Sequence, residues 1–151
     1  MDESKKFEKE QILVSACLLG LKCRYDGEDA LNSELICKDR EDFIPVCPEQ
    51  LGGLSTPREP CEIAGGSGED VLAGRGKVIG RISGTDFTAQ FLRGAEQTLI
   101  LAKIFGCRKA IFKSLSPSCG KGEIRVKGEI VSGSGVTSAL LESRGIEVTV
   151  I

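Results

Sequence analysis

The sequence predicts an α/β fold with an open, mostly parallel sheet flanked by helices. Short apolar runs rich in β-branched residues alternate along the chain with helical patterns, as expected when crossover helices join parallel strands. Three of these runs are each followed by a cysteine, at the strand end where open α/β sheets bind ligands. The 151 residues suffice for one domain, which we expect over residues 11–151 behind a charged tail at residues 1–10.

The first third of the chain holds two predicted strands and one predicted helix. Residues 11–16 are apolar and β-branched, as in a buried parallel strand, and Cys17 follows them. Residues 30–41 place apolar side chains among charges with helical spacing, which predicts a modest amphipathic helix. These side chains are Leu31, Leu35, Ile36 and Cys37. Residues 43–46 predict the second strand, which ends at Cys47.

The middle of the chain is predicted to be irregular until a long helix begins. Residues 48–68 contain three prolines and five glycines, which predicts a long loop of the kind that often carries function. Residues 71–82 predict one or two short strands. A helix capped by Thr85 or Asp86 then runs to about Phe105.

The last third of the chain contains the third strand and an unusual cysteine. Residues 108–113 predict the strand, and the segment SLSPSCGKG follows it with Cys119 among turn-forming residues. A cysteine kept only as a small apolar side chain would normally lie in a strand or helix, so this position indicates another role. Residues 122–134 predict a hairpin with a glycine in its turn, residues 136–143 a short helix, and residues 146–151 a final strand.

The composition restricts the classes of function. A net charge of −2 argues against a general nucleic-acid surface, although one local group of basic side chains could attract a phosphate. That group comprises Lys109, Lys113, Lys121, Arg125 and Lys127. No apolar run approaches the roughly 20 residues of a membrane helix, and the N-terminal segment lacks the apolar centre of a signal peptide. We therefore expect a cytoplasmic protein with no membrane partner.

Seven cysteines stand out in a chain that contains no histidine. An odd number of cysteines without an export signal argues against a disulfide framework and favours free thiols or metal ligands. The absence of histidine excludes cysteine–histidine nucleophile pairs and imidazole bases, so acid–base chemistry has to use other groups.

Cys17, Cys47 and Cys119 follow three predicted parallel strands, so we expect them to converge at one edge of the sheet. Any one of them could be a buried small side chain, but three at matching positions favour a shared site. Three thiolates suit either zinc with an open position or a cubane iron–sulfur cluster with one iron free of protein ligands, and the residue pattern leaves both open. Cys23 and Cys61, in loops, are the candidate fourth ligands.

Six motifs occur in a characteristic order along the chain. They are SACLLG (15–20), CRYDG (23–27), PVCPEQLGGLSTPREPCEI (45–63), GTDFTAQFLRGA (84–95), SPSCG (116–120) and GVTSALL (135–141). In this order they resemble the thiouracil desulfidase family, long catalogued as a domain of unknown function, and the resemblance covers nearly the whole chain after the tail. It implies a Rossmann-like fold and a single catalytic desulfidase domain. It also implies a [4Fe-4S] cluster with one open iron, whose three cysteine ligands match Cys17, Cys47 and Cys119.

The resemblance further implies a non-redox desulfuration. The sulfur of a thiolated pyrimidine, either thiouracil or its nucleoside or nucleotide, binds the open iron, and water replaces it on the ring carbon. Sulfide is released and the oxo form of the pyrimidine remains. The expected partner is therefore a small-molecule substrate, with no general nucleic-acid binding.

Three residues are assigned to this chemistry. Glu49, two residues after Cys47, is the expected acid–base carboxylate, and the alternative is that it caps a helix or pairs with Arg58. Ser116 and Ser114 can hydrogen-bond the pyrimidine or the water, although serines close to a proline are also common turn formers.

Other interpretations remain open at this point. Arg24, Asp26 and Arg58 are expected to pair with one another and fix the loops at the same edge of the sheet. A zinc-dependent hydrolase could use the same three thiolates with Glu49 as its base. A carrier of sulfur or of iron–sulfur clusters could use the cysteines for transfer to a partner protein.

Overall fold

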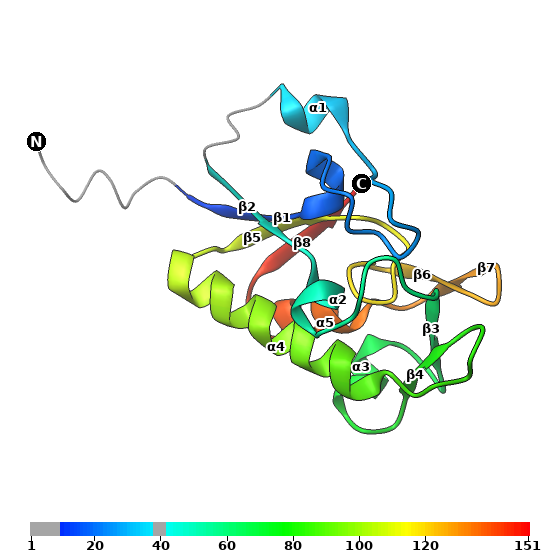
Figure 1. Ribbon diagram of the computed structural model, residues 1–151. Coiled ribbons are helices and arrows are strands. Elements are labelled where there is room, and N and C mark those ends of the chain that lie inside the picture. The colour runs from blue at the N-terminus through cyan, green and yellow to red at the C-terminus, as the bar shows by residue number, and fades with distance from the viewer. Residues whose placement is uncertain (1–9, 38–41) are drawn as a thin grey trace, which may run out of the picture.

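Four parallel strands form the central sheet of the computed structural model, which describes residues 10–37 and 42–151 (Figure 1). They are β1 (Ile12–Ser15), β2 (Phe43–Val46), β5 (Lys109–Phe112) and β8 (Glu147–Val150), in the order β2-β1-β5-β8. The predicted fold class and all four predicted sheet strands are thus confirmed. The predicted tail lies outside the described residues except for the exposed Glu10.

Two helices cover one face of this sheet. They are α4 (Thr88–Phe105) and α5 (Val136–Ser143), which lie together beneath the strands in Figure 1. Side chains of alternate strand residues, such as Leu13 and Val148, pack against Leu99 and Leu141 of these helices in one buried cluster. The opposite side chains of β1 pack against the segment after it, in a second cluster that includes Val14 and Cys17.

The two predicted helix ends at glycine are confirmed. Gly106, with φ of 65°, follows α4, and Gly145, with φ of 82°, lies two residues after the end of α5. Both have the left-handed backbone that glycine adopts without strain. The predicted cap at Thr85 or Asp86 is wrong by at least one residue, because the N-cap position of α4 is Phe87, which makes no side-chain cap. The Asp86 carboxylate, one residue earlier, accepts the backbone N–H of Thr88 at 2.8 Å. No helix in the described part of the chain is long and apolar enough to span a bilayer.

The predicted helix over residues 30–41 is wrong. In its described part, residues 30–37, the single turn α1 (Ser33–Ile36) is the helix that forms, and Asn32 caps it by accepting two backbone N–H groups. Leu35 is buried, but Leu31 is 52% exposed and Cys37 is exposed, so Leu35 is the one predicted apolar side chain that is buried in the core. A longer helix would gain too little from packing. Residues 38–41, the rest of the predicted helix, lie outside the described part.

Residues 48–68 are more regular than predicted. They contain the single-turn helix α2 (Pro48–Leu51) and the strand β3 (Cys61–Ala64), which pairs antiparallel with β4 (Lys77–Gly80). Proline occupies the first turn of α2, where its missing N–H costs nothing.

The prediction for residues 71–82 is correct only in its second half. The helix α3 (Gly68–Leu72) precedes β4, and the carboxylate of Asp70 accepts the Ser67 backbone N–H at 2.9 Å in a capping box. The predicted hairpin is confirmed as β6 (Glu123–Val126) and β7 (Glu129–Ser132), joined by a turn that contains Gly128.

Two glycines fix α2 against α4. A Cβ at Gly52 would collide with the carbonyl of Gln90, and one at Gly94 with the carbonyl of Pro48. The backbones of the two helices therefore approach more closely than any other residue would permit. This contact places the residues at the start of α2, directly after β2, at the carboxyl edge of the sheet.

Candidate active site

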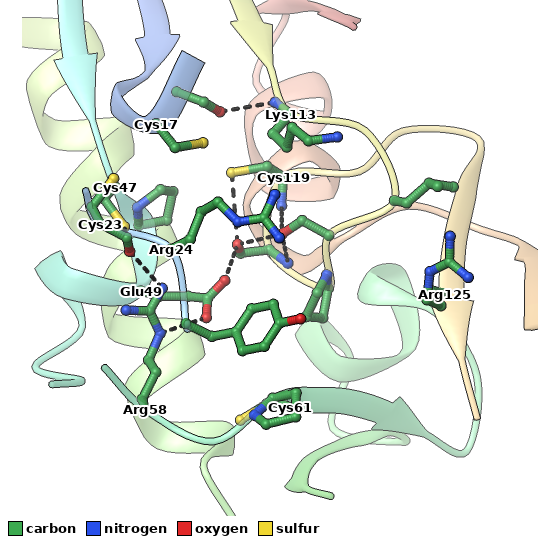
Figure 2. A pocket seen from close by; sticks show the side chains of 18 of the residues that line it. Cys17, Cys23, Arg24, Cys47, Glu49, Arg58, Cys61, Lys113, Cys119 and Arg125 are labelled. Carbon is green, nitrogen blue, oxygen red and sulfur yellow. Dashed lines mark hydrogen bonds and ion pairs between the residues drawn. The ribbon is translucent and has the colours of Figure 1, made fainter. Parts of the chain in front are cut away.

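A pocket of about 370 Å³ opens at the carboxyl edge of the parallel sheet (Figure 2). Cys17, Cys47 and Cys119 all line it, each from the segment that follows β1, β2 or β5. The sulfur atoms of Cys17 and Cys119 point toward one another in Figure 2. The structure therefore brings together the three cysteines that the strand argument selected.

Backbone hydrogen bonds hold the loops that carry these cysteines. After β1 the chain enters a 3₁₀ turn (Ala16–Leu19), and the Cys17 carbonyl accepts the N–H of Ala30 at 2.9 Å. The loop that carries Cys119 rests on the N-terminus of α5, where Val136 and Thr137 donate to the carbonyls of residues 117 and 118. Any side chain on Gly135 would collide with this loop.

Cys23 is a fourth thiol beside this group. It is buried and packs in the same cluster as Cys17 and Cys47, and its carbonyl oxygen lies 3.7 Å from the Cys47 sulfur. The other candidate fourth ligand, Cys61, lines the pocket on the far side of Glu49 in Figure 2 and contacts the carbonyl of Glu59 instead.

Burial and mutual contact set the protonation of the thiols. Burial raises the pKa of Cys119 to about 12, despite hydrogen bonds from Ser118 and Ser15. The pKa of Cys47 is raised, first by a hydrogen bond with Cys23 and second by burial. The pKa of Cys17 is lowered, mainly by a hydrogen bond from Cys23. Cys119 and Cys47 therefore ionise readily only when a cation binds them, as thiolate ligands of metals do.

Glu49 is held between two hydrogen-bond donors at the centre of the pocket. Its Oε1 accepts the Nε–H of Arg58 at 2.9 Å, and its Oε2 accepts the hydroxyl of Ser118 at 2.9 Å. Ser118 Oγ in turn lies 3.6 Å from the sulfur of Cys119. Glu49 thus pairs with Arg58, as the alternative interpretation expected, and also lines the pocket next to a candidate ligand, as the catalytic assignment requires.

Arg58 connects three parts of the site. Besides Glu49, its guanidinium donates to the carbonyl of Cys23 at 3.0 Å and to the hydroxyl of Thr56 at 3.1 Å. Its side chain is 7% exposed. The expected pair of Arg24 with Asp26 is present at 3.3 Å, but Arg58 does not join it, because it is committed to Glu49.

The serines divide into different roles. The hydroxyl of Ser116 accepts the backbone N–H groups of residues 118 and 119, both at 3.1 Å, so it shapes the turn as well as lining the pocket. Ser114 lines the pocket beside the Lys113 ammonium. Ser118, which the sequence reasoning missed, is the serine that contacts Glu49. The available signal was its position directly before Cys119.

Within residues 10–37 and 42–151, no three side chains of cysteine, aspartate or glutamate are grouped so that they could hold one metal ion. A zinc ion would need its sulfur ligands close together, because each Zn–S bond is only about 2.3 Å long. A cluster of four irons is wider, so three thiols spread around one pocket suit it better.

Three comparisons relate this chain to known proteins. The profile of the family described as 2-thiouracil desulfurase matches residues 12–151. The uncharacterized protein YbbK of Bacillus subtilis (strain 168) is 49% identical over 142 residues, which cover 91% of this chain and 93% of that protein. The solved structure of the [4Fe-4S]-dependent thiouracil desulfidase TudS superposes with a TM-score of 0.81 at 42% identity, covering 94% of this chain and 91% of that chain.

The ion pair of Glu49 and Arg58 makes a stability prediction. Replacing Arg58 with Met leaves the carboxylate buried without its partner, which typically costs about 3–5 kcal/mol. We expect a loss of this size in the free energy of unfolding, measured by urea denaturation of the iron-free protein. Arg75→Met is the control, because the side chain of Arg75 is 67% exposed in its pair with Asp70 and little change should follow. Equally small losses for both variants would contradict the account.

Proposed function

Because the chain belongs to the 2-thiouracil desulfurase family, we propose that it removes sulfur from a thiolated pyrimidine with a [4Fe-4S] cluster held by Cys17, Cys47 and Cys119. The family makes the protein an enzyme of the desulfidase class. The observation that carries the assignment of ligands is the meeting in one pocket of three cysteines that follow three parallel strands, beside a largely buried carboxylate.

The residues present fit such a cluster. Thiolates are its usual protein ligands, and three of them leave one iron without a protein ligand. When bound, the cluster supplies an open, soft iron that binds a sulfur atom and polarises the carbon attached to it. The 370 Å³ pocket is of the size that binds small molecules.

Glu49 is the group that moves protons in this proposal. Its Oε2, which accepts the Ser118 hydroxyl, takes one proton from the attacking water and returns it to the departing sulfur, which leaves as HS⁻, while the second water proton passes to solvent. Arg58 fixes the other carboxylate oxygen, so the carboxylate cannot turn away. Ser118 commits its one hydroxyl proton to Glu49. Ser116, whose hydroxyl oxygen lies 2.9 Å from that of Ser118, can hydrogen-bond the water or the pyrimidine by turning its proton away from Ser118. Ser114 also lines the pocket, where it can contact the substrate.

The alternatives receive less support. A zinc hydrolase needs an ion-sized site, and the described part of the chain offers none. A sulfur or cluster carrier needs accessible cysteines, whereas Cys119 is 5% and Cys23 4% exposed. A pocket with a fixed carboxylate is what turnover of a small substrate requires.

The charges of the pocket favour an anionic substrate. Arg81, Lys113, Arg125 and Lys127 line it, and Glu62 is the one lining carboxylate besides Glu49, which pairs with Arg58. Arg81 and Glu62 form an ion pair at 3.6 Å, which leaves a surplus of positive charge. This surplus supports the nucleotide form of the substrate, because a phosphate group would meet it.

The ligand assignment predicts which cysteines hold iron. After anaerobic reconstitution, the wild type should contain about four irons per chain, and Cys17→Ala, Cys47→Ala and Cys119→Ala should lose the cluster with its visible absorption. Cys61→Ala is the matched control, since it lies in the same pocket apart from the other thiols, and should retain the iron. Full iron content in any of the first three variants removes that cysteine from the ligand set.

The acid–base assignment predicts an inactive enzyme with an intact cluster. Glu49→Gln keeps the shape of the side chain and removes its basicity, so sulfide release from thiouracil should fall about 10²- to 10⁴-fold while the iron content stays the same. Glu62→Gln, which changes a lining carboxylate that pairs with Arg81 instead of Arg58, should retain most of the activity. Turnover of Glu49→Gln close to that of the wild type would disprove the catalytic role.

The charge argument predicts a preference among substrates. We expect kcat/KM for a thiouridine 5′-monophosphate to exceed that for the free base, and the difference to shrink as salt rises. Arg125→Gln should reduce kcat/KM for the monophosphate and leave that for the base unchanged. An equal effect of Arg125→Gln on both substrates would argue against phosphate binding at this wall.

A further inference from the structure

The pocket contains one aromatic side chain. Tyr25 is the only tyrosine of the chain, which has no tryptophan, and none of the six phenylalanines lines the pocket. The other lining side chains are charged, polar, sulfur-containing or small and aliphatic. Among the described residues, Tyr25 therefore offers the one aromatic surface on which a flat heterocyclic ring in this pocket could stack.

Tyr25 does not pack in the core of the protein. It is 42% exposed and belongs to none of the three clusters of buried apolar residues. In the described part of the chain its hydroxyl has no hydrogen-bond partner. A single exposed aromatic is common on protein surfaces, but this one borders the pocket that binds the substrate. Its apolar ring surface is free to gain from contact with a ligand.

The backbone of Tyr25 is nevertheless fixed. Its carbonyl accepts the backbone N–H of Arg58 at 2.8 Å, and the turn closes with Gly27 N–H donating to the Arg24 carbonyl at 3.0 Å. Gly27 has φ of 79°, which glycine adopts without strain. Arg58 also holds Glu49 through its side chain. Arg58 thus holds both the backbone of Tyr25 and the carboxylate of Glu49 in place.

Arg24 limits the movement of the ring. Its guanidinium carbon lies 5.7 Å from the centroid of the Tyr25 ring, a cation–π distance, and its position is held by Asp26. In Figure 2 the Arg24 side chain extends into the pocket toward Cys119. The segment from Arg24 to Gly27 therefore presents a restrained aromatic ring on the wall of the pocket. A ring restrained before binding loses little entropy when a ligand stacks on it.

We propose that Tyr25 binds the pyrimidine ring of the substrate by stacking. This inference rests on the proposed function, which supplies the pyrimidine. It makes Tyr25 a substrate-binding residue that orients the ring and takes no part in proton transfer. Stacking acts equally on the substrate and on the transition state, so it affects KM and leaves kcat nearly unchanged.

The first test compares two variants of the reconstituted enzyme. Tyr25→Leu removes the aromatic surface, and KM for the thiopyrimidine should rise about 5- to 100-fold with kcat within about threefold of the wild type. Tyr25→Phe is the matched control, because it keeps the ring and loses only a hydroxyl without a partner in the described residues. Its KM should stay within about twofold of the wild-type value.

The second test does not depend on turnover or on a variant that folds. Because the chain has a single tyrosine, incorporation of 3-fluorotyrosine gives one ¹⁹F resonance, which reports on Tyr25 in the reconstituted wild-type protein. Addition of the reaction product, uracil or its 5′-monophosphate, should shift this resonance in a saturable way. A third test, which uses the variants, is calorimetry with the same product, which should show weaker binding to Tyr25→Leu than to Tyr25→Phe.

The outcomes separate this inference from the proposed function. Wild-type turnover with an unchanged KM in Tyr25→Leu, or an unmoved ¹⁹F resonance at saturating product, overturns the role of Tyr25 alone. Failure of the wild-type enzyme to turn over any thiopyrimidine overturns the proposed function, and this inference with it. A rise in KM for Tyr25→Phe equal to that for Tyr25→Leu would assign the effect to the hydroxyl and also overturn the stacking role.

Discussion

The nearly buried ion pair of Glu49 with Arg58 is the contact on which the site depends. Removing two charges from water is costly, so both partners have to be fully hydrogen-bonded where they lie. Arg58 meets this demand with the carbonyl of Cys23, and Glu49 meets it with the hydroxyl of Ser118. The pair therefore joins the loop after β1, the start of α2 and the loop after β5 into one unit. These are the segments that carry the cysteines.

The parallel sheet explains why these segments meet at all. Its strands end at one edge, and the close contact of Gly52 with α4 directs the chain after β2 back over that edge. The thiol of Cys119 remains protonated on its own, because burial raises its pKa. Binding of a cation changes this balance. A family whose members desulfurate thiouracil supplies a reason for the arrangement.

Much of this could be read from the sequence, because the informative signals are local. The four sheet strands are short β-branched runs, and Gly106 marks a helix end by its own backbone preference. The convergence of Cys17, Cys47 and Cys119 follows from strand direction alone. The single-turn helices α1 and α2 could not be sized from sequence, because short helices owe their stability to caps and tertiary contacts.

The sequence also could not show which carboxylate pairs with Arg58. Asp26 and Glu49 are both acidic residues in nearby loops, and only the packing of α2 decides between them. The most direct test of the central claim is an anomalous-scattering map at the iron edge from crystals of the reconstituted protein. The account predicts density for four irons bounded by the sulfurs of Cys17, Cys47 and Cys119, next to Glu49. Iron bound elsewhere, or a single zinc ion on these thiolates, would contradict it.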